Sequence, residues 1–254
     1  MSDISCHRDG PVLRLTFNRP HVLNAVTPAV LDDLTELLTE TAEDPSVRVI
    51  VLAGAGRAFS SGADLTAVSD LPPEATLQAA NRLIRCLGTL PQPVVAAVQG
   101  PAAGVGASIA LACDLVLAST TAFFQLAFVN IGLMPDGGAT LLVPANIGRA
   151  RALRLALLGE RLPAALAADW GLIHQVVEPP ELAGAVDELA TRLSRAAPLA
   201  LAAAKRAVNA ATLGGLEDSL ERELIGQSAL LGSEDFQSAV TAFRDKQTPY
   251  FAGR

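Results

Sequence analysis

The chain has 254 residues, of which 50% are hydrophobic and 18% charged, and its formal net charge is −7. This length predicts one large domain or a core with a small appendage, and the composition excludes a largely disordered chain. The acidic balance argues against nucleic acid as the main partner, because phosphate binding needs a basic surface.

Cysteine usage and the N-terminal segment favour a soluble, cytoplasmic protein. The three cysteines, Cys6, Cys86 and Cys113, are scattered and form no CxxC pair, so a reduced setting is expected. The first residues include acids and lack the apolar run of a signal peptide. The longest apolar stretches are interrupted by Gly, Pro or Asp, so no membrane span is expected.

The first half of the chain is predicted to alternate strands with helices. Residues 12–17 alternate apolar and polar side chains, as a half-buried strand does, and a later β-branched run indicates a buried strand. Thr27 followed by Pro28 is a typical helix start, with a capping hydroxyl and a proline at the first helical position. The expected strands are residues 12–17, 47–52, 93–98 and 114–118, and a second helix is expected at 74–87.

From Arg149 onward the pattern is mostly helical, with one possible strand at residues 172–177. The expected C-terminal helices are residues 198–211, residues 216–231 and one that starts near Ser233. One face of the last helix is apolar and consists of Phe236, Ala239, Val240 and Phe243. We therefore divide the chain into an α/β core, residues 1–195, and a helical C-terminal region, residues 196–254. No long linker separates them, so the two parts are expected to pack together.

Two glycine-rich segments, residues 54–65 and 100–108, each follow a predicted strand. Small residues let a ligand approach the backbone closely, and a helix starting near Gly104 would direct free N–H groups at an anion. Two such turns facing each other could bind one developing oxyanion. Either segment alone is better explained as a tight turn. Because both follow buried strands, we favour an oxyanion-binding site formed by the two together.

Motifs for other reactions are incomplete in this sequence. Ala107 stands where a P-loop needs its phosphate-binding lysine, and the third glycine of a dinucleotide fingerprint is missing. Ser108 lacks the closing glycine of a nucleophile elbow. Three histidines, expected in a tail, a loop and a strand with surface or packing roles, are His7, His21 and His174. Metal-ligand spacing is absent, so no metal is expected.

Asp136 is an acid in a loop of Gly and Pro residues with apolar neighbours. Asp before two glycines commonly caps a helix N-terminus, and this is the better explanation of the residue alone. The functional alternative is a general base whose pKa is raised by apolar surroundings.

Taken together, these segments resemble the enoyl-CoA hydratase/isomerase (crotonase) superfamily over nearly the whole chain. The matching stretches are residues 18–20, 23–25, 59–65, 97–106, 112–114, 132–138, 170–173, 242–246 and 249–251. Their order and spacing are specific for the superfamily and much less so for the reaction. The resemblance implies an α/β, ClpP/crotonase-like spiral of strand–strand–helix (ββα) units with a helical C-terminal trimerisation region, and hence a homotrimer or hexamer.

The resemblance also implies an acyl-CoA thioester substrate whose thioester oxygen is held by two backbone N–H groups. By position these groups belong to Ala63 and Val105, the latter at a place where the family more often has glycine. Coenzyme A would enter as part of the substrate, so no permanently bound cofactor is expected. The residues expected near the coenzyme are His21, Leu23, Ala63, Asp64, Leu65, Phe243 and Lys246, with Arg19 as a second basic candidate beside His21.

The departure from the family's pattern concerns catalytic carboxylates. Hydratases of the family use two glutamates to activate water, and Ser108 and Phe128 occupy those positions here. Asp136 falls where isomerases of the family carry an acid, so the resemblance favours double-bond isomerisation with Asp136 as the acid and base. Two alternatives stay open: an enoyl-CoA hydratase or other acyl-CoA lyase with an unrecognised acid, and a catalytically silent acyl-CoA-binding protein.

Overall fold

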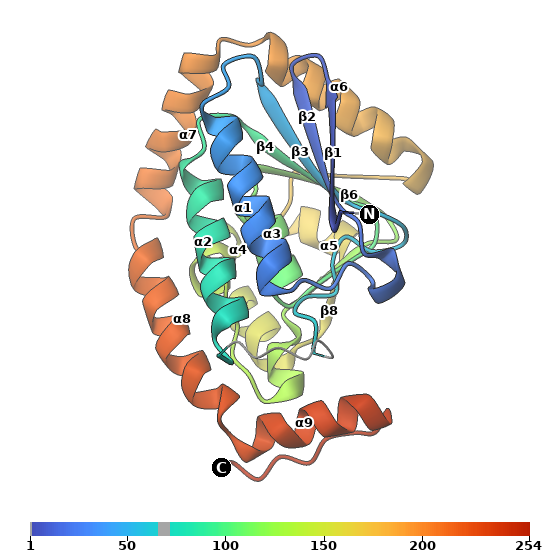
Figure 1. Ribbon diagram of the computed structural model, residues 1–254, viewed down its shortest axis with the longest axis vertical. Coiled ribbons are helices and arrows are strands. Elements are labelled where there is room, and N and C mark those ends of the chain that lie inside the picture. Colours follow the sequence, from blue (N-terminus) through green and yellow to red (C-terminus); the bar gives the residue numbers. More distant parts are fainter. Residues whose placement is uncertain (1, 66–71) are drawn as a thin grey trace.

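The computed structural model describes residues 2–65 and 72–254, and its centre is a six-stranded sheet with helices on both faces (Figure 1). The strand order is β1-β2-β3-β4-β6-β9, in which β1 and β2 are antiparallel and the later pairs are parallel. The strands are β1 (Ile4–Asp9), β2 (Val12–Phe17), β3 (Val49–Gly54), β4 (Val94–Val98), β6 (Leu115–Ser119) and β9 (Gln175–Val177). The apolar β3 and β4 lie in the middle, because a parallel strand covered on both faces has no polar side to expose.

Successive turns of the chain repeat a long strand of this sheet, a short strand of a second sheet, and a helix. The short strands are β5 (Pro101–Ala103), β7 (Phe123–Gln125) and β8 (Arg161–Pro163), and the helices of these turns are α2 (Ala75–Thr89), α3 (Val105–Ala112) and α4 (Ala139–Leu158). Strand β4 leads through β5 to α3, and β6 leads through β7 to α4. A bridge between Ser60 and Ala102 joins the turn after β3 to the second sheet. The strand–strand–helix spiral expected from the resemblance is therefore present.

Two apolar layers hold the sheet in place. On one face α1 (Pro28–Ala42) packs beside α2, and Thr27 caps α1 as predicted by accepting the N–H of Val30. On the other face α6 (Leu182–Arg195) covers β2, β3, β4 and β6, with Val186 among its buried residues. Short elements complete the chain: η1 (Pro20–Val22), η2 (Ala127–Ile131), η3 (Pro179–Glu181) and α5 (Ala164–Asp169).

Several local predictions were wrong in ways that hydrogen bonds explain. The expected N-terminal tail forms β1, so His7 lies in a strand opposite Arg14. Strand β3 begins two residues later than predicted, because the N–H of Val47 still closes a turn onto the carbonyl of Asp44. His174 precedes β9 instead of lying in a strand.

Helix α4 was also placed wrongly, since it begins at Ala139 and not near Arg149. Gly148, with φ 76° and ψ 164°, interrupts it with a kink. The sequence pattern therefore predicted only the part of α4 that follows Gly148 and missed the part that precedes it.

The C-terminal helices are α7 (Pro198–Thr212), α8 (Leu216–Leu231) and α9 (Glu234–Asp245). Helices α7 and α8 run along one side of the molecule, and α9 crosses its end (Figure 1). The expected boundary near residue 195 falls between α6 and α7, and the division into two regions stays a prediction. Among residues 2–65 and 72–254, no helix is long and apolar enough to cross a bilayer.

Candidate active site

The two glycine-rich segments meet at their glycines. A Cβ built on Gly62, whose φ is +97°, would lie 2.8 Å from the carbonyl oxygen of Ala103. A Cβ on Gly104, whose φ is +53°, would lie 3.7 Å from the Cα of Gly62. The positive φ of both residues and the close approach at Gly62 require glycine, so the two backbones touch without intervening side chains.

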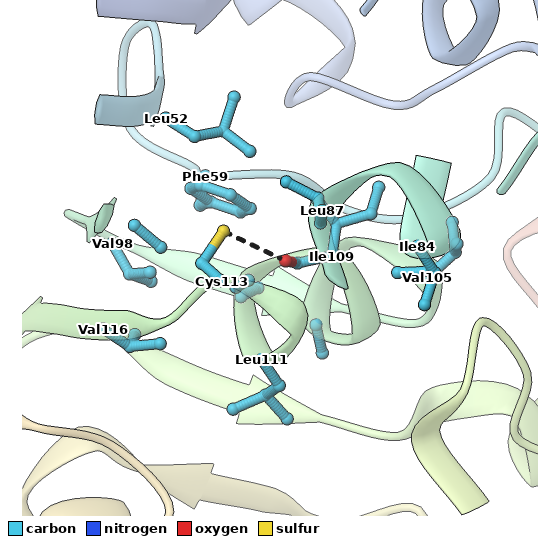
Figure 2. Close-up of a cluster of buried hydrophobic side chains, with 14 of the residues drawn as sticks. Leu52, Phe59, Ile84, Leu87, Val98, Val105, Ile109, Leu111, Cys113 and Val116 are labelled. Carbon is cyan, nitrogen blue, oxygen red and sulfur yellow. Dashed lines mark hydrogen bonds between the residues drawn. The ribbon is translucent and has the colours of Figure 1, made fainter. Parts of the chain in front are cut away.

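The residues that follow these glycines are Ala63 and Val105. In the part of the chain that the structure describes, neither backbone N–H donates a hydrogen bond. Val105 is the first residue of α3, where N–H groups have no partner within the helix. Its side chain lies in the apolar cluster with Ile84 and Ile109, which fixes the start of the helix (Figure 2). The structure thus brings together the two predicted oxyanion donors on neighbouring turns.

A third loop, residues 19–25, is fastened to the first glycine-rich segment. The buried Asn24, in the left-handed conformation with φ 56°, donates to the carbonyls of Ala55 and Ala58 at 2.9 and 2.8 Å. Ser60 Oγ donates to the carbonyl of Asn24 at 2.8 Å. These bonds give the loop before Ala63 one fixed path, a function for Asn24 that sequence reasoning missed.

The predicted coenzyme-binding residues fall into two groups. Arg19 is engaged inside the protein, because its guanidinium binds Asp64 at 3.1 Å and the carbonyl of Ala25 at 2.6 Å. His21, in η1, is exposed, whereas Leu23 and Leu65 are half-buried. His21 is therefore the basic side chain of this loop that stays at the surface.

The second group lies on α9. Phe243 is 56% exposed and Lys246 is exposed at the end of this helix. Helix α9 packs against η2 and α8 at one end of the molecule (Figure 1). Among the described residues, no hydrogen bond or ion pair joins Phe243 or Lys246 to the loop of His21.

Asp136 is a buried carboxylate that uses one of its two oxygens in hydrogen bonds to the described residues. Its Oδ2 accepts a 2.8 Å hydrogen bond from Nε2 of Gln227, whereas Oδ1 is buried and has no partner among the described residues. Burial raises the pKa of Asp136 to about 7, because the charged form loses its hydration. The bond from Gln227 lowers this pKa and the negative charge of Glu223 raises it. The side chain can therefore exchange a proton near neutral pH.

Asp136 does not cap α4, so the simpler sequence interpretation is wrong. The N-cap residue is Gly138, and the carboxylate of Glu223 accepts from the N–H of Gly138 at 2.7 Å and of Thr140 at 2.9 Å. An acid from a distant helix thus satisfies the first turn of α4. Sequence reasoning could not assign Glu223, because its spacing on α8 is that of an ordinary helical acid.

The Asp136 loop lies directly against the start of α3. A Cβ built on Gly137 would be 3.5 Å from Cγ2 of Val105 and 3.0 Å from Cβ of Ser108. Ser108 is fully buried and its Oγ donates to the carbonyl of Asp136 at 2.7 Å. Phe128 is buried in η2. The loop that carries Asp136 is therefore held next to the start of α3, where the Val105 N–H has no hydrogen-bond partner among the described residues.

Residues 7–254 match the sequence profile of the family described as enoyl-CoA hydratase/isomerase. The chain belongs to this family. Nearly all of the chain is covered, so the enoyl-CoA hydratase/isomerase family accounts for both the spiral core and the C-terminal helices.

Relatives in the family carry names of both reaction types. The chain is 40% identical, over the full length of both proteins, to the 1,2-epoxyphenylacetyl-CoA isomerase of Escherichia coli K12. It is also 40% identical, over 94% of each chain, to a probable enoyl-CoA hydratase of Rhodobacter capsulatus. A crystal structure of an enoyl-CoA hydratase from Mycobacterium avium subsp. paratuberculosis K-10 superposes with a TM-score of 0.94 at 48% identity, covering 99% of both chains. The predicted crotonase fold is confirmed.

Proposed function

We propose that this acyl-CoA enzyme moves a carbon–carbon double bond in an enoyl-CoA thioester, with Asp136 as both base and acid. The observation that carries the proposal is the buried carboxyl of Asp136: its Oδ1 has no partner among the described residues, its pKa is raised to about 7, and the neighbouring Gly137 lies against Val105. A group with this pKa gives and takes protons with similar ease at neutral pH.

The chemistry follows from the two parts of the site. The ionised Asp136 removes a proton from a carbon that is acidified by the thioester and the double bond. The electron pair moves toward the thioester oxygen, and the N–H groups of Ala63 and Val105 stabilise the resulting dienolate. The protonated Asp136 then returns its proton to a different carbon, so the double bond shifts and no water is consumed.

Hydration is disfavoured by the side chains in the positions of the family's two glutamates. Ser108 donates its hydrogen bond to a backbone carbonyl, and the phenyl ring of Phe128 takes no proton. A hydratase or other acyl-CoA lyase remains the second candidate, because relatives at 35–40% identity have hydratase names. The isomerase name of one relative supports including ring-type CoA thioesters among the substrates.

A substrate panel tests the proposal. Purified protein is incubated with 3-enoyl-, 2-enoyl- and ring-type CoA thioesters, and double-bond migration and hydration are followed separately by chromatography and mass spectrometry. Migration is expected to dominate. Its kcat/KM should fall as the pH drops through about 7, because protonated Asp136 cannot accept a proton.

Two outcomes would contradict this. Rapid addition of water to a 2-enoyl-CoA would favour the hydratase alternative. Tight binding of every thioester with no turnover would favour the catalytically silent acyl-CoA-binding protein.

In the proposed reaction coenzyme A is part of the substrate, and it is held by His21, Leu23 and the segment from Ala63 to Leu65.

The same proposal includes a homotrimer or a hexamer, with Phe243 and Lys246 reaching coenzyme on a neighbouring subunit. Exposed apolar side chains on α7, α8, α9 and the C-terminal segment support it, and they are Leu199, Val208, Ile225, Phe243 and Tyr250. Burying such apolar side chains between subunits would be favourable. Light scattering is expected to give three or six times the mass of one chain, and a monomer at micromolar concentration would contradict it.

A further inference from the structure

Helix α8 turns a polar stripe toward the Asp136 loop. Ser219, Glu223 and Gln227 recur every four residues and are 2%, 0% and 1% exposed. Residues four apart lie on one face of a helix, and buried polar groups are retained where they have partners. The partners of Glu223 and Gln227 all belong to residues 134–140.

Gln227 binds the loop at three points. Its Oε1 accepts from the N–H of Met134 at 3.0 Å, and its Nε2 donates to the Met134 carbonyl at 3.0 Å and to Oδ2 of Asp136 at 2.8 Å. The Met134 side chain packs against the neighbouring Gly226, where a Cβ would lie 2.5 Å from the Met134 sulfur. The amide therefore fixes the backbone and one carboxylate oxygen together.

Glu223 caps the N-terminus of α4, a function that a nearby Asp such as Asp136 commonly has. Its carboxylate accepts from the N–H groups of Gly138 and Thr140 and from the Thr140 hydroxyl at 2.6 Å. A negative charge at a helix N-terminus is favourable, so Glu223 stabilises α4 in the place of a local cap. The carboxylate of Asp136 therefore takes no part in capping α4.

We infer that α8 positions the acid–base group: Gln227 holds Oδ2 of Asp136 and leaves Oδ1 as the oxygen that exchanges the substrate's proton, while Glu223 caps α4 in its place. Both are positioning residues, since they act through Asp136. This inference rests on the proposed isomerase function.

The surroundings of Asp136 make its proton affinity sensitive to both residues. From α8 the charge of Glu223 raises its pKa and the amide of Gln227 lowers it, and Arg222 acts on Glu223. From α3 the neutral Ser108 contacts the loop. From α9 Asp235 packs against Gly132, but its carboxylate accepts from the N–H groups of residues 252 and 253. Glu223 and Gln227 therefore shift the pKa of Asp136 in opposite directions.

The experiment compares Gln227→Met with Glu223→Gln and with the matched control Gln237→Met. Gln237 is an exposed glutamine on α9 whose side-chain amide makes no hydrogen bond among the described residues. Methionine keeps the length of glutamine and removes the donor that favours ionised Asp136. The Asp136 titration should move up by about one pH unit or more in Gln227→Met. In Glu223→Gln it should move down, and in Gln237→Met it should stay unchanged.

The titration is read by infrared spectroscopy of protein labelled with carbon-13 aspartate, and the Asp136 band is the one lost in Asp136→Asn. This readout needs no turnover. In parallel, the low-pH limb of kcat for double-bond migration should follow the same shifts, with KM within about threefold at high pH. A merely structural function of α8 predicts loss of folding or of kcat without opposite shifts.

The outcomes separate the two claims. An unshifted Asp136 band in folded Gln227→Met overturns the positioning inference, even if the protein is an isomerase. Shifts in the expected directions uphold the control of the Asp136 titration by α8. If Asp136→Asn then isomerises at the original rate, the proposed function falls, and with it the role of Oδ1 in the reaction. Should Glu223→Gln fail to fold, the comparison of Gln227→Met with Gln237→Met still decides.

Discussion

Asp136→Asn is expected to lower kcat for double-bond migration by about 10³–10⁴-fold, since one side chain performs both proton transfers. Asparagine has nearly the same shape, and its Oδ1 can still accept from Gln227. Coenzyme binding should change little, because the residues proposed to hold the coenzyme do not include Asp136. The measurement is kcat and KM for a 3-enoyl-CoA, together with the affinity for a saturated acyl-CoA by calorimetry.

The same variant should be more stable than the original protein at pH 8. The pKa of Asp136 is raised by burial from 3.8 to about 7, so between these values the folded state holds a proton that the unfolded state releases. That stabilisation is complete below about 3.8 and is lost as the pH rises through about 7. Asparagine never ionises, so its advantage at pH 8 should be about 1–3 kcal/mol and should shrink toward pH 5.

Chemical denaturation at pH 8 and pH 5, at a fixed protein concentration, measures this difference. A stable variant with normal acyl-CoA affinity and no migration would identify Asp136 as catalytic. A folded Asp136→Asn protein that isomerises at the original rate would remove it from the mechanism.

The second large effect is expected from Val105→Pro, which deletes one backbone donor. Proline is well tolerated as the first residue of a helix, and the Val105 N–H has no partner to lose among the described residues. Gly104, with φ 53° and ψ −134°, is outside the α region that a following proline disfavours. Loss of one oxyanion donor should reduce kcat by about 10²–10³-fold.

Two controls accompany this variant. Val105→Ala removes methyl groups and keeps the N–H, so it is expected to cost far less activity than proline. Free coenzyme A has no thioester oxygen, so its affinity should be the same for Val105→Pro and the original protein. If Val105→Pro folds and turns over normally, the thioester oxygen is bound elsewhere.

Much of the fold could be predicted from the sequence because its signals are local. The helix cap at Thr27 and the apolar strands 93–98 and 114–118 were predicted close to their observed positions. Errors occurred where a distant partner decides the structure. Strand β1 exists through its pairing with β2, and residues 4–9 alone have no apolar face that indicates a strand.

In the candidate site, too, the residues with local sequence signals could be predicted and those that depend on distant partners could not. The glycines that let the two loops touch could be recognised as small residues after strands, and Asp136 could be recognised as an acid in a Gly/Pro loop. Glu223 and Gln227 could not, because α8 also carries Glu217 and Glu221, which are exposed at equally helical spacing. Only the folded chain shows which acid faces the loop.

The contact between Gln227 and Asp136 spans 91 positions of the chain, and this separation has a consequence for protein synthesis. The ribosome completes the sheet, both glycine-rich loops and Asp136 well before it reaches Gln227. Domains generally form in the order in which they are made. The amide that orients the Asp136 carboxyl is therefore among the last parts of the proposed site to be synthesised.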